Sequence, residues 1–151
     1  TLYLKLICED ENSFIKNAAQ LVAEQLSLVN ISVTVEYLTS RDFNTALSEG
    51  EYDLYINEIK LTKNMDLSEF FTSSGQASKG IDLDNTDVDE SYFSYVQGSE
   101  ELSGFLTDFD NSMPFIPLVY RNGQLCYSRS IKSVIEAAED RLFMNVADWK
   151  L

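Results

Sequence analysis

The first 60 residues alternate between two kinds of hydrophobic spacing. Residues 2–8 form a nearly continuous apolar run, residues 31–37 alternate strictly between apolar and polar positions, and residues 52–57 form a third short apolar stretch. Patterns of this kind predict strands. Between them, residues 13–28 and 39–50 place apolar side chains at helical spacing. The resulting β-α-β-α-β order predicts three parallel strands joined by right-handed helical crossovers.

The ends of both predicted helices carry capping signals. Asn12 or Ser13 can cap the first helix. Thr39 and Asp42 form a candidate capping box for the second helix, and Gly50 is placed to end it. These signals support the two helices independently of the hydrophobic spacing.

The second half of the chain has a less regular pattern. Residues 66–71 predict a single helical turn. Two longer helices are predicted after a polar loop. The first runs from a cap at Thr86 or Asp87 to about residue 96, and the second covers about residues 99–111.

A hairpin signal follows these helices. Asn122 and Gly123 stand between two apolar stretches, and an Asn-Gly pair in that setting favours a type I′ turn with positive φ at both residues. The sequence therefore predicts a late β-hairpin that adds an antiparallel contribution to the sheet. The predicted fold class is an α/β domain with a mixed sheet. Residues 130–143 can form either one more helix or a turn-rich stretch.

Length and charge limit the classes of function. The chain has 151 residues, 44% of them hydrophobic, which suits a single α/β lobe over residues 1–151. The net charge of −14 disfavours binding to nucleic acids and to anionic membranes, because both need clustered Lys and Arg. No apolar run is long enough to span a membrane, and no signal peptide or lipid-attachment sequence is visible. A strand pattern that begins at Thr1 suggests a segment of a longer protein.

The sequence contains few signals for catalysis. Histidine is absent, which removes Ser-His-Asp and Cys-His mechanisms, and neither a P-loop nor a dinucleotide-binding motif occurs. Cys8 and Cys126 lie in apolar stretches and are expected to be buried thiols, with a disulfide between them left open. Residues 13–16 fit S-x-x-K without its companion motifs, and the acidic residues 82–90 lack the Gly and Glu of a calcium loop. We therefore expect no catalytic residue, no cofactor and no metal.

A polar run directly after the third predicted strand is the strongest indication of a site. In an open parallel sheet, ligands bind beyond the carboxyl ends of the strands. The predicted strands end at residues 9–10, 39–40 and 57–58, so these ends should share one edge. A solvated surface loop is the alternative explanation. Apolar walls would come from residues such as Tyr55 or Phe70. The candidate ligand-binding residues are Asn57, Glu58, Lys60, Asn64 and Asp66.

Several ordered blocks also carry a family resemblance. Residues 50–53 (GEYD) form a G-x-Y-D start to a strand, and residues 66–71 (DLSEFF) form a D-x-x-x-F-F segment. Residues 114–129 contain a P-x-I-P-L-like strand pattern, and residues 145–151 (NVADWKL) have a Trp near the end. Together these blocks resemble the second lobe of the family 5 extracellular solute-binding proteins, the oligopeptide- and dipeptide-binding proteins of bacterial ABC transporters.

The resemblance implies a lobe of the type II periplasmic-binding-protein kind. Such a lobe closes with a first lobe around a peptide or other small solute and delivers it to an ABC transporter permease, without enzymatic activity. The first lobe, the hinge strands and a lipid anchor would then lie outside this chain. The implied location is extracellular, as a membrane-anchored lipoprotein, or periplasmic. Peptide-binding members pair an Asp with the peptide amino terminus, and here Glu58 or Asp66 would take that place.

Two other classes of function stay open at this point. Glu58 and Asp66 could serve as the acid and base of a small acidic hydrolase if they face each other across a cleft. A protein-interaction module would instead show a sizeable exposed apolar patch.

Overall fold

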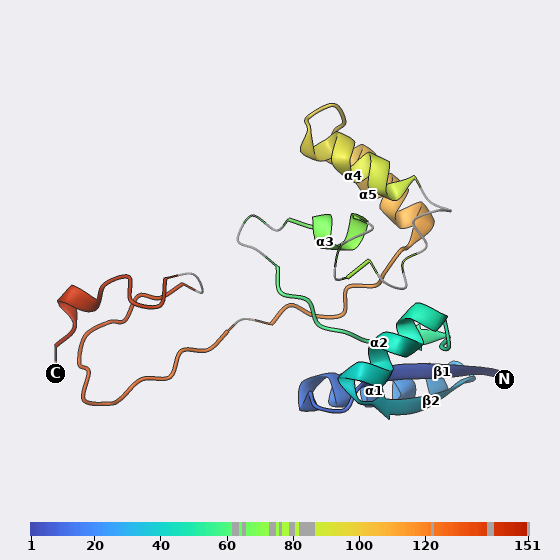
Figure 1. Cartoon of the computed structure of the whole chain (residues 1–151), viewed down its shortest axis with the longest axis horizontal. Coiled ribbons are helices and arrows are strands. Elements are labelled where there is room, and N and C mark those ends of the chain that lie inside the picture. The colour runs from blue at the N-terminus through green and yellow to red at the C-terminus, as the bar shows by residue number, and fades with distance from the viewer. Residues whose placement is uncertain are drawn as a thin grey trace. The chain divides into compact units, whose positions relative to one another are not determined.

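The computed structural model describes residues 1–61, 64, 66–72, 75, 77–78, 81, 87–121, 123–138 and 141–150 (Figure 1). The chain divides into two compact units, Thr1–Phe115 and Ile116–Leu151. Among the described residues, the first unit contains the sheet and the α-helices, and the second contains one short 3-10 helix.

An open sheet of three parallel strands organises the start of the first unit. The strands are β1 (Leu2–Glu9), β2 (Ile31–Leu38) and β3 (Leu54–Tyr55), in the order β2-β1-β3. β1 pairs with β2 at eight positions and with β3 at two. The prediction of an α/β fold with three parallel strands is confirmed. β3 is shorter than predicted, although the backbone N–H of Ile56 still donates to the carbonyl of Ile7 at 3.1 Å.

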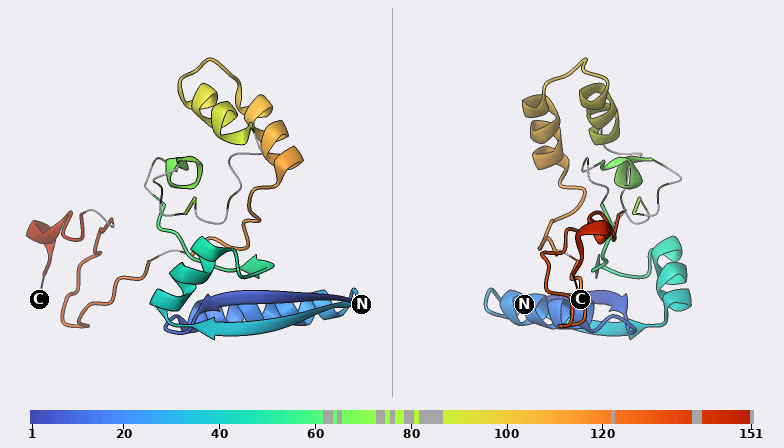
Figure 2. Two further views of the ribbon diagram at one scale, coloured as in Figure 1. Left: turned by 45° about the vertical axis from the view of Figure 1, so that its right-hand side comes forward. Right: turned by 90° about the vertical axis from the view of Figure 1, so that its left-hand side faces the viewer.

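The two crossover helices cover opposite faces of this sheet (Figure 2). Alternate residues of β1 point to opposite sides, so Leu6 and Ile7 belong to different cores. Leu6 and Cys8 pack with Ile15 and Ala19 of α1 (Ser13–Ser27). On the other face, α2 (Ser40–Glu49) packs on Ile7 through Phe43, Ala46 and Leu47.

The capping signals predicted for the first two helices are confirmed. The side-chain oxygen of Asn12 accepts from the N–H groups at the start of α1. Thr39 Oγ1 accepts from the backbone N–H of Asp42 at 3.2 Å and donates to its carboxylate at 2.8 Å. Gly50 ends α2 with φ of 71°, a left-handed conformation that glycine adopts without a steric penalty.

A cluster of aromatic side chains joins the later helices of the first unit. These helices are α3 (Ser68–Phe71), α4 (Val88–Val96) and α5 (Leu102–Ser112), close to the predicted spans. Asp87 precedes α4 as predicted but makes no side-chain capping bond, and Thr86 lies outside the described residues. The buried aromatic members are Phe71, Tyr92 and Phe105, and Val88 is buried with them.

The second unit is mostly irregular. Its 3-10 helix, η2 (Val146–Asp148), is held by side-chain bonds, such as the one that Ser133 Oγ donates to the carbonyl of Asp148 at 2.9 Å. The described part of residues 130–143 contains no helix, so the turn-rich alternative is the correct one. Cys126 is exposed and not buried as predicted, and both Cys8 and Cys126 are free thiols.

The predicted hairpin in this unit is wrong for the residues that the structure describes. Residues 113–121 and 123–128 contain no strand, and Gly123 does not have the positive φ that a type I′ turn requires. Asn122 lies outside the described residues. The physical reason is that a two-stranded hairpin is marginal without a third strand or an apolar cover. Here the apolar side chains on both sides of the turn, including Tyr120 and Tyr127, are exposed. The three-stranded sheet is consequently parallel and not mixed.

Candidate functional site

The carboxyl edge of the sheet, beside β1 and β3, is the candidate site. The chain passes from β1 to β2 on one side of β1, and then to β3 on its other side. β1 and β3 are therefore neighbours in the sheet that are not consecutive in the chain, and ligands of open α/β sheets bind at the carboxyl edge where the strand order reverses in this way. The residues in question are Asp10 to Asn12 after β1, and Asn57 and Glu58 after β3.

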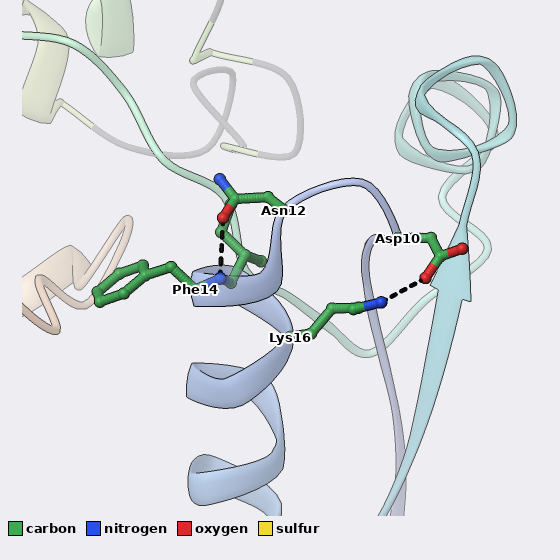
Figure 3. Close-up of polar contacts among 5 residues, drawn as sticks. Asp10, Asn12, Phe14 and Lys16 are labelled. Atoms are coloured by element: carbon green, nitrogen blue, oxygen red, sulfur yellow. Dashed lines mark hydrogen bonds and ion pairs between the residues drawn. The ribbon is translucent and has the colours of Figure 1, made fainter.

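Asn12 connects these two loops. Its side-chain oxygen accepts from the backbone N–H groups of Phe14 at 3.0 Å and Ile15 at 3.3 Å. Its side-chain nitrogen points away from the helix (Figure 3). This nitrogen donates to the carboxylate of Glu58 at 3.2 Å. One carboxamide thus binds the start of α1 and a side chain 46 residues further along the chain.

A charged pair lies next to Asn12. Lys16 Nζ is 2.8 Å from a carboxylate oxygen of Asp10 (Figure 3) and 5.7 Å from the centre of the Tyr37 ring. The hydrogen bond to Asp10 raises the pKa of Lys16, which therefore stays protonated. Burial raises the pKa of Cys8 beneath this pair, so that thiol stays protonated and is poorly suited as a nucleophile.

The predicted site residues are all exposed, but they do not share one environment. Asn57 and Glu58 lie at the sheet edge, where the side-chain oxygen of Asn57 accepts from the backbone N–H of Glu58 at 2.8 Å. Lys60 and Asn64 come later in the chain, and both lie outside the helices and strands. Asp66 precedes α3 and belongs to the helical part of the unit.

Asp66 has a clear structural role. Its carboxylate accepts from the backbone N–H of Ser68 and from the hydroxyl of Tyr92, each at 2.9 Å. The Tyr92 hydroxyl in turn accepts from the backbone N–H of Leu67 at 2.8 Å. Asp66 therefore holds α4 against the start of α3.

The acid stability of this helical part is expected to depend on Asp66. The backbone N–H of Ser68, followed by the side chains of Ser68 and Tyr92, lowers the pKa of Asp66 below its ordinary value of 3.8. A carboxyl with a lower pKa in the folded state stabilises the fold above its unfolded pKa, and this contribution is lost as pH falls through the folded pKa. Asp66→Asn should therefore flatten the decrease of the urea midpoint below about pH 4. Asp110→Asn removes a charge from an exposed position of α5 and should leave the decrease as in the parent chain.

The sequence interpretation missed three residues of this edge: Asp10, Asn12 and Lys16. A usable signal was present, because the polar segment of residues 9–12 also follows a strand end. Residues 9–10 are predicted at the shared edge and Asn12 as a candidate helix cap, but this segment is not among the candidate ligand-binding residues. The carboxyl-edge rule applies to β1 as well as to β3, and it favours both loops equally.

Two cavities among the described residues lie elsewhere. A groove of about 190 Å³ lies over the α2 face, lined by Lys5, Glu36, Asp42 and their neighbours. A wider hollow of about 550 Å³ in the second unit is lined by Lys132, Trp149 and neighbouring residues. Neither contains a predicted site residue. Within the described part of the chain, no group of three His, Cys, Asp or Glu side chains is placed to hold a metal ion.

Fold and edge together define an open α/β domain with polar groups at its topological switch point. No protein-family model matches the chain, and no curated protein matches it in sequence. None of the helices in the described residues is both long and apolar enough to cross a membrane.

Proposed function

We propose that this chain is the ligand-binding lobe of an ABC-transporter solute-binding protein, of the type II periplasmic-binding-protein kind. It would close with a first lobe around a peptide or another small solute and deliver that solute to a permease. The protein would act outside the cell membrane, as a lipoprotein or in the periplasm. The observation that carries the proposal is the polar edge at the β1–β3 switch point, where Asn12 and Glu58 meet.

The blocks that resemble this family have defined roles in the fold. Gly50 ends α2, Tyr52 packs on Tyr55 at a ring distance of 5.4 Å, and the carboxylate of Asp53 accepts from the backbone N–H of Lys5 at 2.7 Å. The G-x-Y-D block thus ends a helix, fills a core and fixes β3 against the central strand. A strand fixed in this way presents its following loop at the carboxyl edge, where the proposed ligand binds.

The hypothesis of a small acidic hydrolase has less support. A general acid needs a carboxyl whose pKa is raised. The hydrogen bonds to Asp66 lower its pKa instead, and they commit that carboxylate to the contact between α3 and α4. The interaction module is the stronger second candidate, because the second unit exposes many large apolar side chains. Those between residues 116 and 127 are Ile116, Leu118, Val119, Tyr120, Leu125 and Tyr127.

Calorimetric titration of the two-lobed protein against a panel of peptides and other small solutes tests the proposal. Glu58→Ala should weaken binding, because a carboxylate that pairs with a cationic or N–H group inside a closed cleft contributes about 2–5 kcal/mol when its partner would otherwise be left unpaired. The isolated chain should bind weakly or not at all, since one lobe covers too little of a small ligand.

Glu51→Ala is the matched control for this titration. Glu51 is also an exposed carboxylate next to β3, but it precedes the strand and so lies away from the carboxyl edge. Its replacement should leave the affinity unchanged. Equal affinities for the Glu58 and Glu51 variants would show that the edge is only solvated surface. Binding to a protein partner without any response to the solute panel would favour the interaction module.

A further inference from the structure

The two ends of the Asn12 side chain have different partners, and their chemistry fixes its orientation. Two backbone N–H groups, from Phe14 and Ile15, face one end of the carboxamide, so that end must be the oxygen. The amide nitrogen is then directed at the Glu58 carboxylate, an acceptor. Because the carboxamide is planar, the helix amides that hold its oxygen also set the direction of its nitrogen.

The two loops joined by this bond differ in how firmly they are held. Asn12 adjoins α1, whose residues Ile15 and Ala19 are buried against β1. Glu58 follows β3, which pairs with β1 at only two positions. The rigid side of the contact is therefore Asn12, and Glu58 is the side chain that gains a fixed place from it.

We infer that Asn12 is a positioning residue that holds Glu58 at the switch point in a geometry ready for the ligand. This inference rests on the proposed function, because a fixed Glu58 side chain matters for binding only if the edge binds a ligand. A side chain that binds a ligand works best when a neighbour on a rigid element holds it in place beforehand.

A capping role alone does not require asparagine at this position. Asp and Ser cap helices about as well as Asn, since each offers an acceptor oxygen to the first N–H groups. An ionised Asp has no donor, and the shorter Ser hydroxyl, placed at the helix N–H groups, does not extend to Glu58 as the Asn12 amide does. Asn12→Asp also places a second carboxylate beside Glu58, whereas Asn12→Ser shortens the side chain without adding charge. The two variants keep the cap and remove the contact in different ways.

A double variant that exchanges the donor and the acceptor tests the contact directly. In the double variant Asn12→Asp with Glu58→Gln, the new amide at position 58 can donate to the new carboxylate at position 12. The hydrogen bond is then restored with donor and acceptor exchanged, while the helix cap stays in place. If residue 58 becomes ordered again in this variant, the order depends on the hydrogen bond and not on the identity of either residue.

The measurement is the backbone ¹⁵N order parameter of residue 58 in the full 151-residue chain, without ligand. We expect about 0.85 in the parent, a decrease toward about 0.6 in both single variants at position 12, and recovery in the double variant. Unchanged chemical shifts through α1 would confirm that the cap is intact.

Three outcomes would overturn the inference: an already mobile residue 58 in the parent, an unchanged order parameter in Asn12→Ser, or no recovery in the double variant. The ligand titration tests the proposed function, and its result does not depend on this measurement. If Asn12→Asp loosens residue 58 but the two-lobed protein binds its solute as before, Asn12 still positions Glu58 and the ligand role of the edge is rejected.

Discussion

Phe71→Ala is expected to lower the free energy of unfolding of the helical part by about 3–5 kcal/mol, the usual cost of truncating a buried phenylalanine. Phe71 is 2% exposed, and its ring lies 5.1 Å from Tyr92, 6.0 Å from Phe105 and 6.2 Å from Phe115. It therefore contacts rings from two other helices and from the segment after them. Removal leaves a cavity that these surrounding rings can fill only in part. Urea denaturation followed by far-UV circular dichroism measures the loss.

Phe93→Ala is the matched control for this change. The same ring is removed from α4, but Phe93 is only half-buried, and its ring contact is with Tyr92 at 5.4 Å. A half-buried ring loses less apolar burial on truncation, so its variant should be clearly more stable than Phe71→Ala. Equal losses would mean that the aromatic cluster is not centred on Phe71.

Phe43→Ala is expected to lower the free energy of unfolding of the sheet by a similar amount, about 3–5 kcal/mol. Phe43 is 1% exposed, packs on Ile7 of the central strand and lies 6.3 Å from the Tyr55 ring of β3. Its loss removes the largest fully buried side chain of the core between α2 and the sheet. Near-ultraviolet circular dichroism should show a weaker tyrosine signal, because Tyr52 and Tyr55 lose their packed surroundings.

Asn44→Ala provides the comparison for Phe43. It changes the neighbouring residue of α2 at an exposed position, where the side chain donates only to the carbonyl of Ser40. Surface substitutions of this kind usually change stability by less than about 0.5 kcal/mol. A Phe43 variant as stable as Asn44→Ala would contradict the packing of α2 on the sheet.

The local features of the fold were predictable because each depends on a short stretch of sequence. Apolar spacing located β1, α1, β2 and α2, and capping residues such as Thr39 and Gly50 located the helix ends. The Asn-Gly signal at Gly123 is also local, yet it failed. A hairpin needs neighbouring strands or apolar cover, and those depend on distant parts of the chain.

The candidate site was only partly predictable for the same reason. The contact between Asn12 and Glu58 depends on β3 pairing with β1, and hydrophobic spacing does not say which strand becomes the neighbour of β3. Asp66 was predicted to face a ligand because it is polar and follows a strand. Its hydrogen-bond partner, Tyr92, lies 26 residues later and belongs to a helix whose packing no local pattern reveals.

The unequal pairing of β1 has a consequence for the order in which the sheet forms and opens. Partners in β1 and β2 are 29 residues apart in sequence, as Leu2 and Ile31 are, and those in β1 and β3 are 48 apart, as Leu6 and Leu54 are. Loop-closure entropy separates these two distances by less than about 1 kcal/mol. The number of paired residues therefore decides the order, eight against two.

β3 is consequently the last strand to dock during folding and the first to leave by local unfolding. Glu58 follows β3 in the chain, so the candidate site is complete only while β3 is paired with β1. Any molecule that binds Glu58 in that state also slows the departure of the strand, because binding draws the population toward the docked form. Under the proposed function, a bound ligand would therefore stabilise a strand that is already docked.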